Sequence, residues 1–249
     1  MYIVLLFLEG VNVCKFFKKG VFLLTYQKDN KLFPKSDSSC FQPFISPNPI
    51  TLYNPVERYP DIDKTAFIGP FTSVIGDVEI KENVYVAPNV SMRADEGTPF
   101  YIGTNTNLQD GVILHGIAKR YVSVKDKKYS IYIENEVSVA HSALIHGPCF
   151  IGNNTFVGYH SIVYNAIVGP DVFISHNAVV TNGVRVPPKR FVPPGAHIDT
   201  QEKADALFLV AEAKEEFAKT VQSINQQFPP SYHILFGEHR CSCGMPYNR

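Results

Sequence analysis

The stretch FIGPFTSVIGDVEIKENVYVAPNVSM (67–92) decides the fold, because a large apolar side chain recurs in it at every sixth position. The recurrent residues are Ile68, Val74, Ile80, Val86 and Met92. The rule continues, interrupted at three places, through Ile102, Leu108, Leu114, Ile133, Val139, Ile145, Ile151, Val157, Val163, Val168, Ile174, Val180, Val186 and Val192. A small or β-branched residue stands four positions later in many units, as at Thr72 and Ala143. Self-similarity at a short fixed period indicates a solenoid.

Six residues provide one short strand and one turn, and three such units close a triangular coil. Each coil stacks its apolar side chains on those of the next coil, so the core is continuous. Helical periodicity is absent from this region, and simple alternation would not single out every sixth residue. We therefore predict an all-β solenoid, a parallel β-helix of hexapeptide repeats, over residues 48–199.

Glycine often follows the recurrent apolar residue, as at Gly69, Gly103, Gly152 and Gly158. A glycine there suits a turn that needs a positive φ or a close approach between two backbones. Asn and Asp occupy many of the other turn positions, because both tolerate turn conformations well.

The segments on either side of the solenoid differ from it in pattern. Residues 1–47 form an N-terminal extension, and residues 229–249 form a tail after Pro229-Pro230. Residues 200–228 are predicted to form one C-terminal helix with Thr200 as its N-cap. Its apolar stripe, Leu207, Val210, Phe217 and Val221, should pack alongside the solenoid or against a neighbouring subunit.

The composition is that of an ordinary globular protein, with 45% hydrophobic residues in a chain of 249. Lys and Arg total 23 and Asp and Glu total 23, so no net charge attracts nucleic acid or an anionic membrane. The apolar runs near the N-terminus are too short to span a bilayer, and the order of a signal peptide is absent. We expect a cytoplasmic protein, with a targeting role for residues 1–47 as the alternative.

The cysteines give no sign of a disulfide framework, because the five are scattered along the chain. Only Cys241 and Cys243 lie close together, with His239 beside them. These residues either bind a metal or belong to an unstructured tail.

Three histidines lie in LHGIAKRYVSVKDKKYSIYIENEVSVAHSALIHG (114–147). His115 and His146 each follow an inward residue of the repeat, so both should point outward from one face of neighbouring coils. The Lys-rich excursion from about Gly116 to Ser130 should bulge away between them. His141 has a different phase and should lie around a corner, so it could join the other two only from a neighbouring subunit. Three imidazoles without a cysteine form an open zinc site, and a three-sided prism favours a trimer.

Polar residues near these histidines complete the candidate site. Arg93, Asp95 and Glu96 stand on the coil before His115, and an ion pair between Arg93 and Asp95 or Asp110 is expected. Asn107 and Gln109 come from the coil of His115 itself. The Gln109 amide could orient a water or an oxyanion.

The motifs RADEG (93–97), NLQDGVILHG (107–116) and VAHSALIHGP (139–148) resemble those of the gamma-class carbonic anhydrases, including the amino-terminal domains of carboxysome assembly proteins. The resemblance covers about Asn48 to Asn225. It implies a left-handed β-helix that forms a homotrimer, with zinc at each subunit interface; Fe²⁺ or Co²⁺ could take its place. The ligands would be His115 and His146 of one subunit and His141 of the next.

The same resemblance implies that a zinc-bound hydroxide converts CO2 to bicarbonate and a proton. Gln109 and Asn107 would place the hydroxide or the bicarbonate. Arg93 would orient bicarbonate or support the structure, and Glu96 would transfer the proton. Asn225 matches a helix asparagine that lines the site.

The sequence departs from active family members at several positions. Ala118 stands where they carry a glutamate that shuttles protons, and Ser223 stands where they carry a tyrosine. We also expect none of the Rubisco-like repeats that follow in carboxysome assembly proteins. A weakly active or inactive zinc trimer, with a structural role and carboxysome-like assembly partners, is therefore the alternative. A hexapeptide acyltransferase with one histidine base is the third hypothesis.

Overall fold

The computed structural model describes residues 6–8, 11–13 and 43–236. The chain divides into two units, Met1–Cys40 and Phe41–Arg249. In the first unit, β1 (Leu6–Leu8) and β2 (Val11–Val13) pair antiparallel. The predictions for most of the N-terminal extension and for Cys241 and Cys243 lie outside the described residues.

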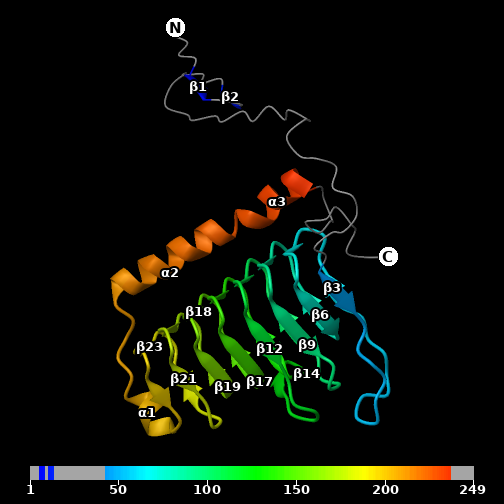
Figure 1. Ribbon diagram of the computed structural model, residues 1–249. Helices are drawn as coiled ribbons and strands as arrows, with labels where there is room; N and C mark the ends of the chain where they lie inside the picture. The colour runs from blue at the N-terminus through cyan, green and yellow to red at the C-terminus, as the bar shows by residue number, and fades with distance from the viewer. Residues whose placement is uncertain (1–5, 9–10, 14–42, 237–249) are drawn as a thin grey trace. The chain divides into compact units, whose positions relative to one another are not determined.

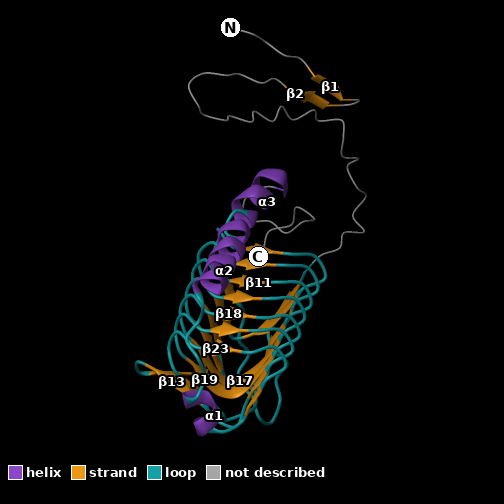
Figure 2. Cartoon of the chain, turned by 90° about the vertical axis from the view of Figure 1, so that its left-hand side faces the viewer, coloured by secondary structure: helices purple, strands orange, loops and turns teal. Residues whose placement is uncertain are grey.

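The second unit is a left-handed parallel β-helix (Figures 1 and 2). Its first face contains β3 (Phe44–Ser46), β6 (Ser73–Gly76), β9 (Ser91–Ala94), β12 (Ile113–His115), β17 (Leu144–Ile151), β19 (Ile162–Val168), β21 (Val179–Val180) and β24 (His197–Ile198). Its second face contains β4 (Asp61–Ile62), β7 (Val78–Ile80), β10 (Phe100–Ile102), β15 (Ile131–Ile133) and β22 (Arg185–Val186). The long strands β17 and β19 pair with both sets, which makes these two faces one 13-stranded sheet.

The third face is a separate 7-stranded sheet. It contains β5 (Phe67–Ile68), β8 (Tyr85–Val86), β11 (Asn107–Leu108), β16 (Ser138–Val139), β18 (Phe156–Val157), β20 (Phe173–Ile174) and β23 (Phe191–Val192). Because β3 pairs with β6, the solenoid begins at Phe44, before the predicted boundary at residue 48. The excursion after His115 forms a hairpin of β13 (Val122–Val124) and β14 (Lys127–Tyr129).

The recurrent apolar side chains fill the interior of the prism, as the repeat predicts. None of them is more than 2% exposed. The companion positions are buried as well, and their hydroxyl groups are satisfied. Thr72 Oγ1 donates to the Ala87 carbonyl, and Ser161 Oγ donates to the Ser175 carbonyl. Buried polar groups without such partners would destabilise the core.

The glycines that follow the apolar residues are needed because the backbone of the next coil lies very close to them. They do not adopt a positive φ. A Cβ at Gly103 would lie 2.6 Å from the Glu134 backbone, and one at Gly152 would lie 2.5 Å from Pro170 N. The positive φ values fall elsewhere in the turns, and Asn adopts them more often than any other residue type, for example Asn83, with φ 53°, and Asn105, with φ 59°. The expectation about Asn is confirmed.

The C-terminal segment forms three helices and not the single helix predicted over 200–228. They are α1 (Gln201–Asp205), α2 (Glu212–Asn225) and α3 (Phe228–Phe236). Thr200 caps α1 as predicted, since its side chain accepts from Lys203 N. Pro229-Pro230 occupy the first turn of α3, where a missing N–H costs little. The predicted tail therefore begins with a helix.

The break between α1 and α2 is caused by the solenoid. Phe191 N donates to the Phe208 carbonyl, and Val210 N donates to the Lys189 carbonyl. These bonds hold residues 208–210 extended against the last coils, so the helical spacing of Leu207 and Val210 is overridden. No helix in the described part of the chain is both long and apolar enough to cross a membrane.

Helices α2 and α3 lie along the 7-stranded face (Figure 1). The Phe217 ring meets Phe156 edge-on at 5.5 Å, and Val221 packs on the same cluster. At the other end, Tyr232 of α3 stacks on Phe67 at 4.4 Å.

Candidate metal centre

His115 and His146 lie side by side on the first face. They are register partners on β12 and β17, and His115 Nδ1 lies 3.2 Å from His146 Nε2. Arg93 precedes them in the same row on β9, and Tyr164 follows them on β19. The phase of the repeat could have identified Tyr164, because it follows Val163 as His146 follows Ile145.

Both histidines precede a glycine for a structural reason. A Cβ at Gly116 or at Gly147 would collide with Ser130, which ends the excursion and is fully buried. The coil closes across the base of the hairpin, since Cys149 N donates to the Ser130 carbonyl. A glycine therefore follows each histidine because Ser130 lies between Gly116 and Gly147 and leaves no room for a side chain at either position.

Charged side chains surround the Nε2 atom of His115. Arg93 Nη2 lies 3.0 Å from it, Asp95 Oδ1 3.5 Å and Glu96 Oε1 3.6 Å. Arg93 Nε also pairs with Asp95 Oδ2 at 3.3 Å, which is one of the two predicted ion pairs. Burial, and then the Arg93 charge, lower the pKa of His115, while both carboxylates oppose the shift. The imidazole is therefore neutral at pH 7 and can offer a lone pair to a metal ion.

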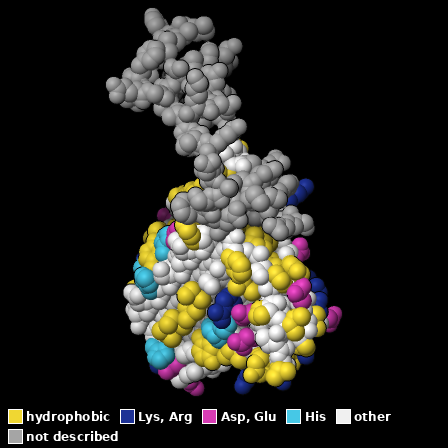
Figure 3. Space-filling model, turned by 45° about the vertical axis from the view of Figure 1, so that its right-hand side comes forward, with side chains coloured by type: hydrophobic (Ala, Val, Ile, Leu, Met, Phe, Trp, Pro, Cys, Tyr) yellow, Lys and Arg dark blue, Asp and Glu magenta, His cyan; other side chains and the backbone are white. Residues whose placement is uncertain are grey.

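A hollow of about 440 Å³ lies beside this cluster. Its lining includes Glu96, Ala118 and the loop residues Pro49 and Tyr53. Ala118 N donates to Glu96 Oε2 at 2.8 Å, which fixes the carboxylate. The loop is held in place because Asn54 Nδ2 donates to the Asp95 carbonyl. Nothing in the repeat pattern pointed to this loop as a wall of the site. Figure 3 shows basic, acidic and histidine side chains gathered on one face beside apolar ones.

His141 lies apart from this pair, in the turn after β16 of the 7-stranded sheet. Its Nδ1 lies 3.0 Å from Asp110 Oδ2, and its side chain is 52% exposed. A carboxylate on Nδ1 fixes the tautomer and leaves the Nε2 lone pair available, as is usual for metal-binding histidines. Tyr159 lies against the ring at 5.4 Å between centroids.

A chain of hydrogen bonds orients Gln109, which follows β11 beside the His141 turn. Gln109 Nε2 donates to Asn107 Oδ1 at 3.0 Å. Asn107 Nδ2 donates to Ser138 Oγ at 2.7 Å and to Gln222 Oε1 at 2.8 Å. Gln222 Nε2 in turn donates to the Asn105 carbonyl. One N–H of the Gln109 amide is donated to Asn107, and this bond fixes the orientation of the amide and of its acceptor oxygen.

Asn225 is not part of this chain of hydrogen bonds. It is buried on α2, and its Nδ2 donates to the Val221 carbonyl of the same helix. The helix residue that contacts the amides is Gln222, which sequence reasoning missed because its partners come from distant coils.

The predicted residues thus form two half-sites. The first, termed the histidine-pair half, contains His115, His146, Arg93, Asp95 and Glu96. The second, termed the amide half, contains His141, Asp110, Gln109 and Asn107. Across residues 43–236, no three His, Cys, Asp or Glu side chains come together to hold a metal within one chain.

An apolar row flanks the histidine pair, starting two residues before His115 and continuing through the register partners of that residue on the following strands. It consists of Ile113, Leu144, Ile162 and Val179, and Ile113 is 46% exposed. Such a row beside an incomplete site suits contact with another protein surface.

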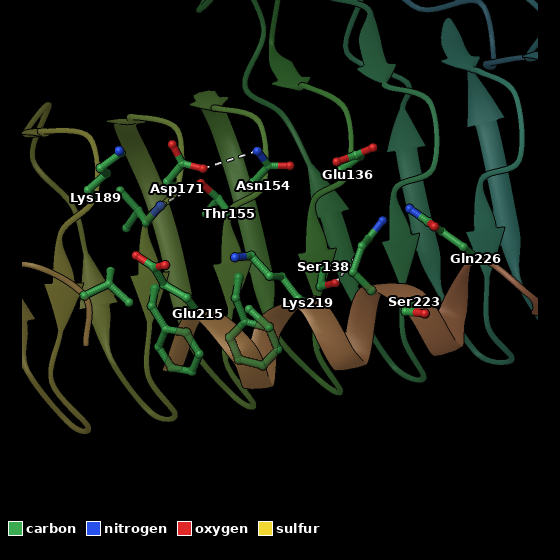
Figure 4. Close-up of a pocket in the computed structure, with 16 residues that line it drawn as sticks. Glu136, Ser138, Asn154, Thr155, Asp171, Lys189, Glu215, Lys219, Ser223 and Gln226 are labelled. Carbon is green, nitrogen blue, oxygen red and sulfur yellow. Dashed lines mark hydrogen bonds between the residues drawn. The ribbon is translucent and has the colours of Figure 1, made fainter. Parts of the chain in front are cut away.

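A second hollow, of about 590 Å³, lies between α2 and the 7-stranded sheet (Figure 4). It is lined by Phe156, Phe173, Lys219 and Gln222 among others, and Asn154 bonds Asp171 at its edge. None of the predicted site residues lines it, so the smaller hollow beside His115 is the better candidate.

No protein-family model matches the chain. The chain is 46% identical over 181 residues to the carboxysome assembly protein CcmM of Nostoc sp., covering 72% of this chain and 32% of that protein. It is 40% identical over 173 residues to the carbonic anhydrase of Methanosarcina thermophila, covering 66% of this chain and 70% of that enzyme. It is 30% identical to the mitochondrial gamma carbonic anhydrase 1 of Arabidopsis thaliana, covering 80% and 66%. The chain spans about a third or less of the length of the CcmM relatives that it matches.

Solved structures share the fold. A hexapeptide transferase family protein from Anaplasma phagocytophilum superposes with a TM-score of 0.59 at 23% identity, covering 76% of this chain and 98% of that one. The product of the BC4754 gene of Bacillus cereus gives a TM-score of 0.63 at 23% identity, covering 78% and 98%. At this identity, only the fold is shared. With the identities above, the chain belongs to the gamma-class carbonic anhydrase family of hexapeptide-repeat proteins and is similar to the amino-terminal domain of CcmM.

Proposed function

We propose that the chain is a carbonic anhydrase whose site forms where two copies meet in a homotrimer. The observation that carries the proposal is the division of the site into two complementary halves. The histidine-pair half offers two neighbouring imidazoles, and the amide half offers an exposed third imidazole oriented by Asp110. A three-fold arrangement would bring the pair of one subunit to His141 of the next.

The donor atoms fit Zn²⁺. His115 and His146 would hold it from one subunit and His141 from the next, and three nitrogen donors leave one coordination position open. Bound Zn²⁺ supplies Lewis acidity and lowers the pKa of a coordinated water to about 7, the value typical of carbonic anhydrases in general. Fe²⁺ or Co²⁺ would suit the same nitrogen donors.

Gln109 would orient the attacking oxygen. Its bond to Asn107 fixes the amide, and its oxygen would accept a hydrogen bond from the nucleophile's O–H. That bond would turn a lone pair of the nucleophile toward the CO2 carbon. The same acceptor would hold the hydroxyl of the bicarbonate product.

Glu96 would take the proton at Oε1, which faces His115, because Oε2 accepts from Ala118 N. The hollow of about 440 Å³ beside it would let water carry the proton away. Arg93 would stabilise the negative charge of bicarbonate, since its guanidinium is placed at the histidine pair.

A second candidate function is a metal-holding trimer that turns over slowly and acts in assembly. Two observations favour it. Ala118 leaves the hollow without the carboxylate that active members carry there, and the relative CcmM is named as a carboxysome assembly protein. Stoichiometric metal without CO2 hydration would support this second function.

The decisive experiment mixes two inactive variants. His115→Ala and His141→Ala would be co-expressed with different tags, purified through both tags and assayed by stopped-flow CO2 hydration. If each site takes its ligands from two subunits, every trimer that carries both tags has an intact ligand set at one of its three interfaces. Co-expression of His115→Ala with His146→Ala is the matched control, because both changes fall in the same half and every site stays broken. No recovery in the first mixture would contradict the proposal.

A further inference from the structure

The strands of the β13–β14 hairpin do not belong to the sheets of the solenoid, and none of the residues of the two half-sites lies on them. The hairpin leaves the solenoid after β12 and returns at Ser130, and its strands form a 2-stranded sheet of their own. Lys125 takes a φ of 52° in the turn between them. Figure 2 shows β13 standing out from the coils. The hairpin is therefore an added element with a defined position.

Aromatic packing holds the base of the hairpin in place. Tyr129 of β14 is 5% exposed and meets Tyr132 edge-on at 4.9 Å and Tyr101 at 6.0 Å. Tyr101 and Tyr132 stack on each other on the second face at 4.5 Å. Val122 and Val124 are half-buried. One side of the hairpin thus faces the solenoid, and its polar side is presented to solvent in a fixed orientation.

The exposed side carries concentrated positive charge. Five exposed cations lie in or next to the hairpin, namely Lys119, Arg120, Lys125, Lys127 and Lys128, against one carboxylate, Asp126. None of the five forms an ion pair with any carboxylate in residues 43–236. Because the whole chain is electrically neutral, this is a local segregation of charge. Like charges at this density repel each other unless an anionic partner is present.

The backbone of the hairpin is also open. Beyond the ladder between β13 and β14, residues 121–129 make no backbone hydrogen bond to the rest of the described chain. Open edges can accept an added strand, and lysines on an edge prevent pairing with neutral or basic strands. The hairpin of a second copy is excluded for the same reason. An acidic strand would form hydrogen bonds with the open backbone edge and would neutralise the exposed lysines.

We propose that the β13–β14 hairpin is a docking site for an extended acidic segment of another protein, which adds as a strand to the hairpin. A membrane surface is less well matched, because the turn carries Lys125, Asp126 and Lys127 and no exposed apolar side chain. The Tyr121 ring nearby is 43% exposed, but it is a single aromatic side chain, and Lys128 Nζ lies over it at 4.3 Å. This inference does not depend on carbonic anhydrase activity.

The test measures binding of a fluorescein-labelled peptide of alternating Glu and Thr by anisotropy, at physiological salt. The variant Lys127→Glu/Lys128→Glu should weaken binding about tenfold or more, because it reverses two charges at the edge. Arg185→Glu/Lys219→Glu makes the same change in net charge on exposed residues outside the hairpin and should leave binding within about twofold. A peptide of alternating Glu and Pro has the same charge but cannot add as a strand, so it should bind much more weakly.

Three results would overturn the proposal. Equal loss in both double variants would mean that only net charge matters. If the Glu–Pro peptide binds as tightly as the Glu–Thr peptide, the segment does not bind by adding a strand to the hairpin. Binding to phosphatidylserine vesicles without binding to the Glu–Thr peptide would assign the hairpin to a membrane surface. CO2 hydration should be unchanged in Lys127→Glu/Lys128→Glu, which separates this inference from the proposed function.

Discussion

The histidine-pair half and the amide half of the candidate site are built in opposite ways. Around His115, an arginine and two carboxylates lie within 3.6 Å of one ring nitrogen, and the buried Asp95 Oδ1 has no hydrogen-bond partner within residues 43–236. His141 instead has one carboxylate partner and an exposed ring. The first half is a preformed cluster that holds two carboxylates and one guanidinium, while the second half has a single oriented imidazole. Under the proposed function, we expect the first half to supply most of the metal affinity and the second half to complete the site.

The largest expected effect is the loss of metal affinity and activity when a histidine is removed, and the loss of affinity should differ between the two halves. His146→Ala should lower zinc affinity more than His141→Ala, because the latter leaves two neighbouring imidazoles in place. Both should reduce CO2 hydration by at least about 1,000-fold, since the metal's chemistry requires the complete set. Metal titration with a competing chelator measures the first effect and stopped-flow measures the second. His197→Ala, an exposed histidine on β24, is the control. Equal metal affinity in the two variants would erase the distinction between the halves.

The carboxylate behind His141 should have the next largest effect. Asp110→Asn keeps the shape of the side chain but removes the charge that fixes the imidazole, so metal affinity should fall about 10- to 100-fold. Asp171→Asn is the control, because Asp171 bonds Asn154 at a turn outside both halves. If both variants bind zinc like the parent protein, Asp110 does not orient a metal ligand.

A glutamate at position 118 should speed proton transfer through the hollow beside His115. Ala118→Glu places a titratable group beside Glu96 and should raise kcat several-fold at low buffer concentration, with little change in kcat/KM. Ala118→Gln has the same length without the proton and should not raise kcat. The measurement is the CO2 hydration rate against buffer concentration. An increase in both variants would indicate a change of shape and not proton transfer.

The smallest effect concerns the support of the amide half. Gln222→Ala removes the acceptor shared by Asn107 and Ser138 and should lower the free energy of unfolding by about 1–3 kcal/mol. A several-fold loss of kcat/KM should accompany it, because the orientation of Gln109 depends on Asn107. Gln227→Ala, which removes an exposed bond within the helix region, should change neither quantity. Urea unfolding of the metal-free protein is the test, and equal destabilisation by the two variants would contradict it.

The sequence was sufficient for the solenoid because each recurrent residue has the same environment. The side chains at positions such as Leu114 and Ile145 differ little in surroundings, so a local rule repeats along the chain. The same phase argument placed His115 and His146 in one row and His141 elsewhere. The metal role of all three remains a prediction.

Features set by contacts between distant segments could not be predicted. The break before α2 depends on bonds from Phe191 and Lys189 to residues 208–210. The role of Gln222 depends on where α2 lies relative to Asn107, and the loop at Pro49 and Tyr53 reaches the site through Asn54. In each case the local pattern is consistent with several conformations, and a partner far along the chain selects one.

The passage of Ser130 between Gly116 and Gly147 has a consequence for how this chain can change. Because the coil closes beneath the excursion, the register of His115 and His146 does not depend on hairpin residues 122–128, whereas Ala118 at the start of the excursion fixes Glu96. Insertions, deletions or an engineered reporter could be accommodated in the hairpin without moving the imidazoles. The chain thus has a site of free variation next to its most constrained residues, where new interactions can arise while the chemistry is preserved.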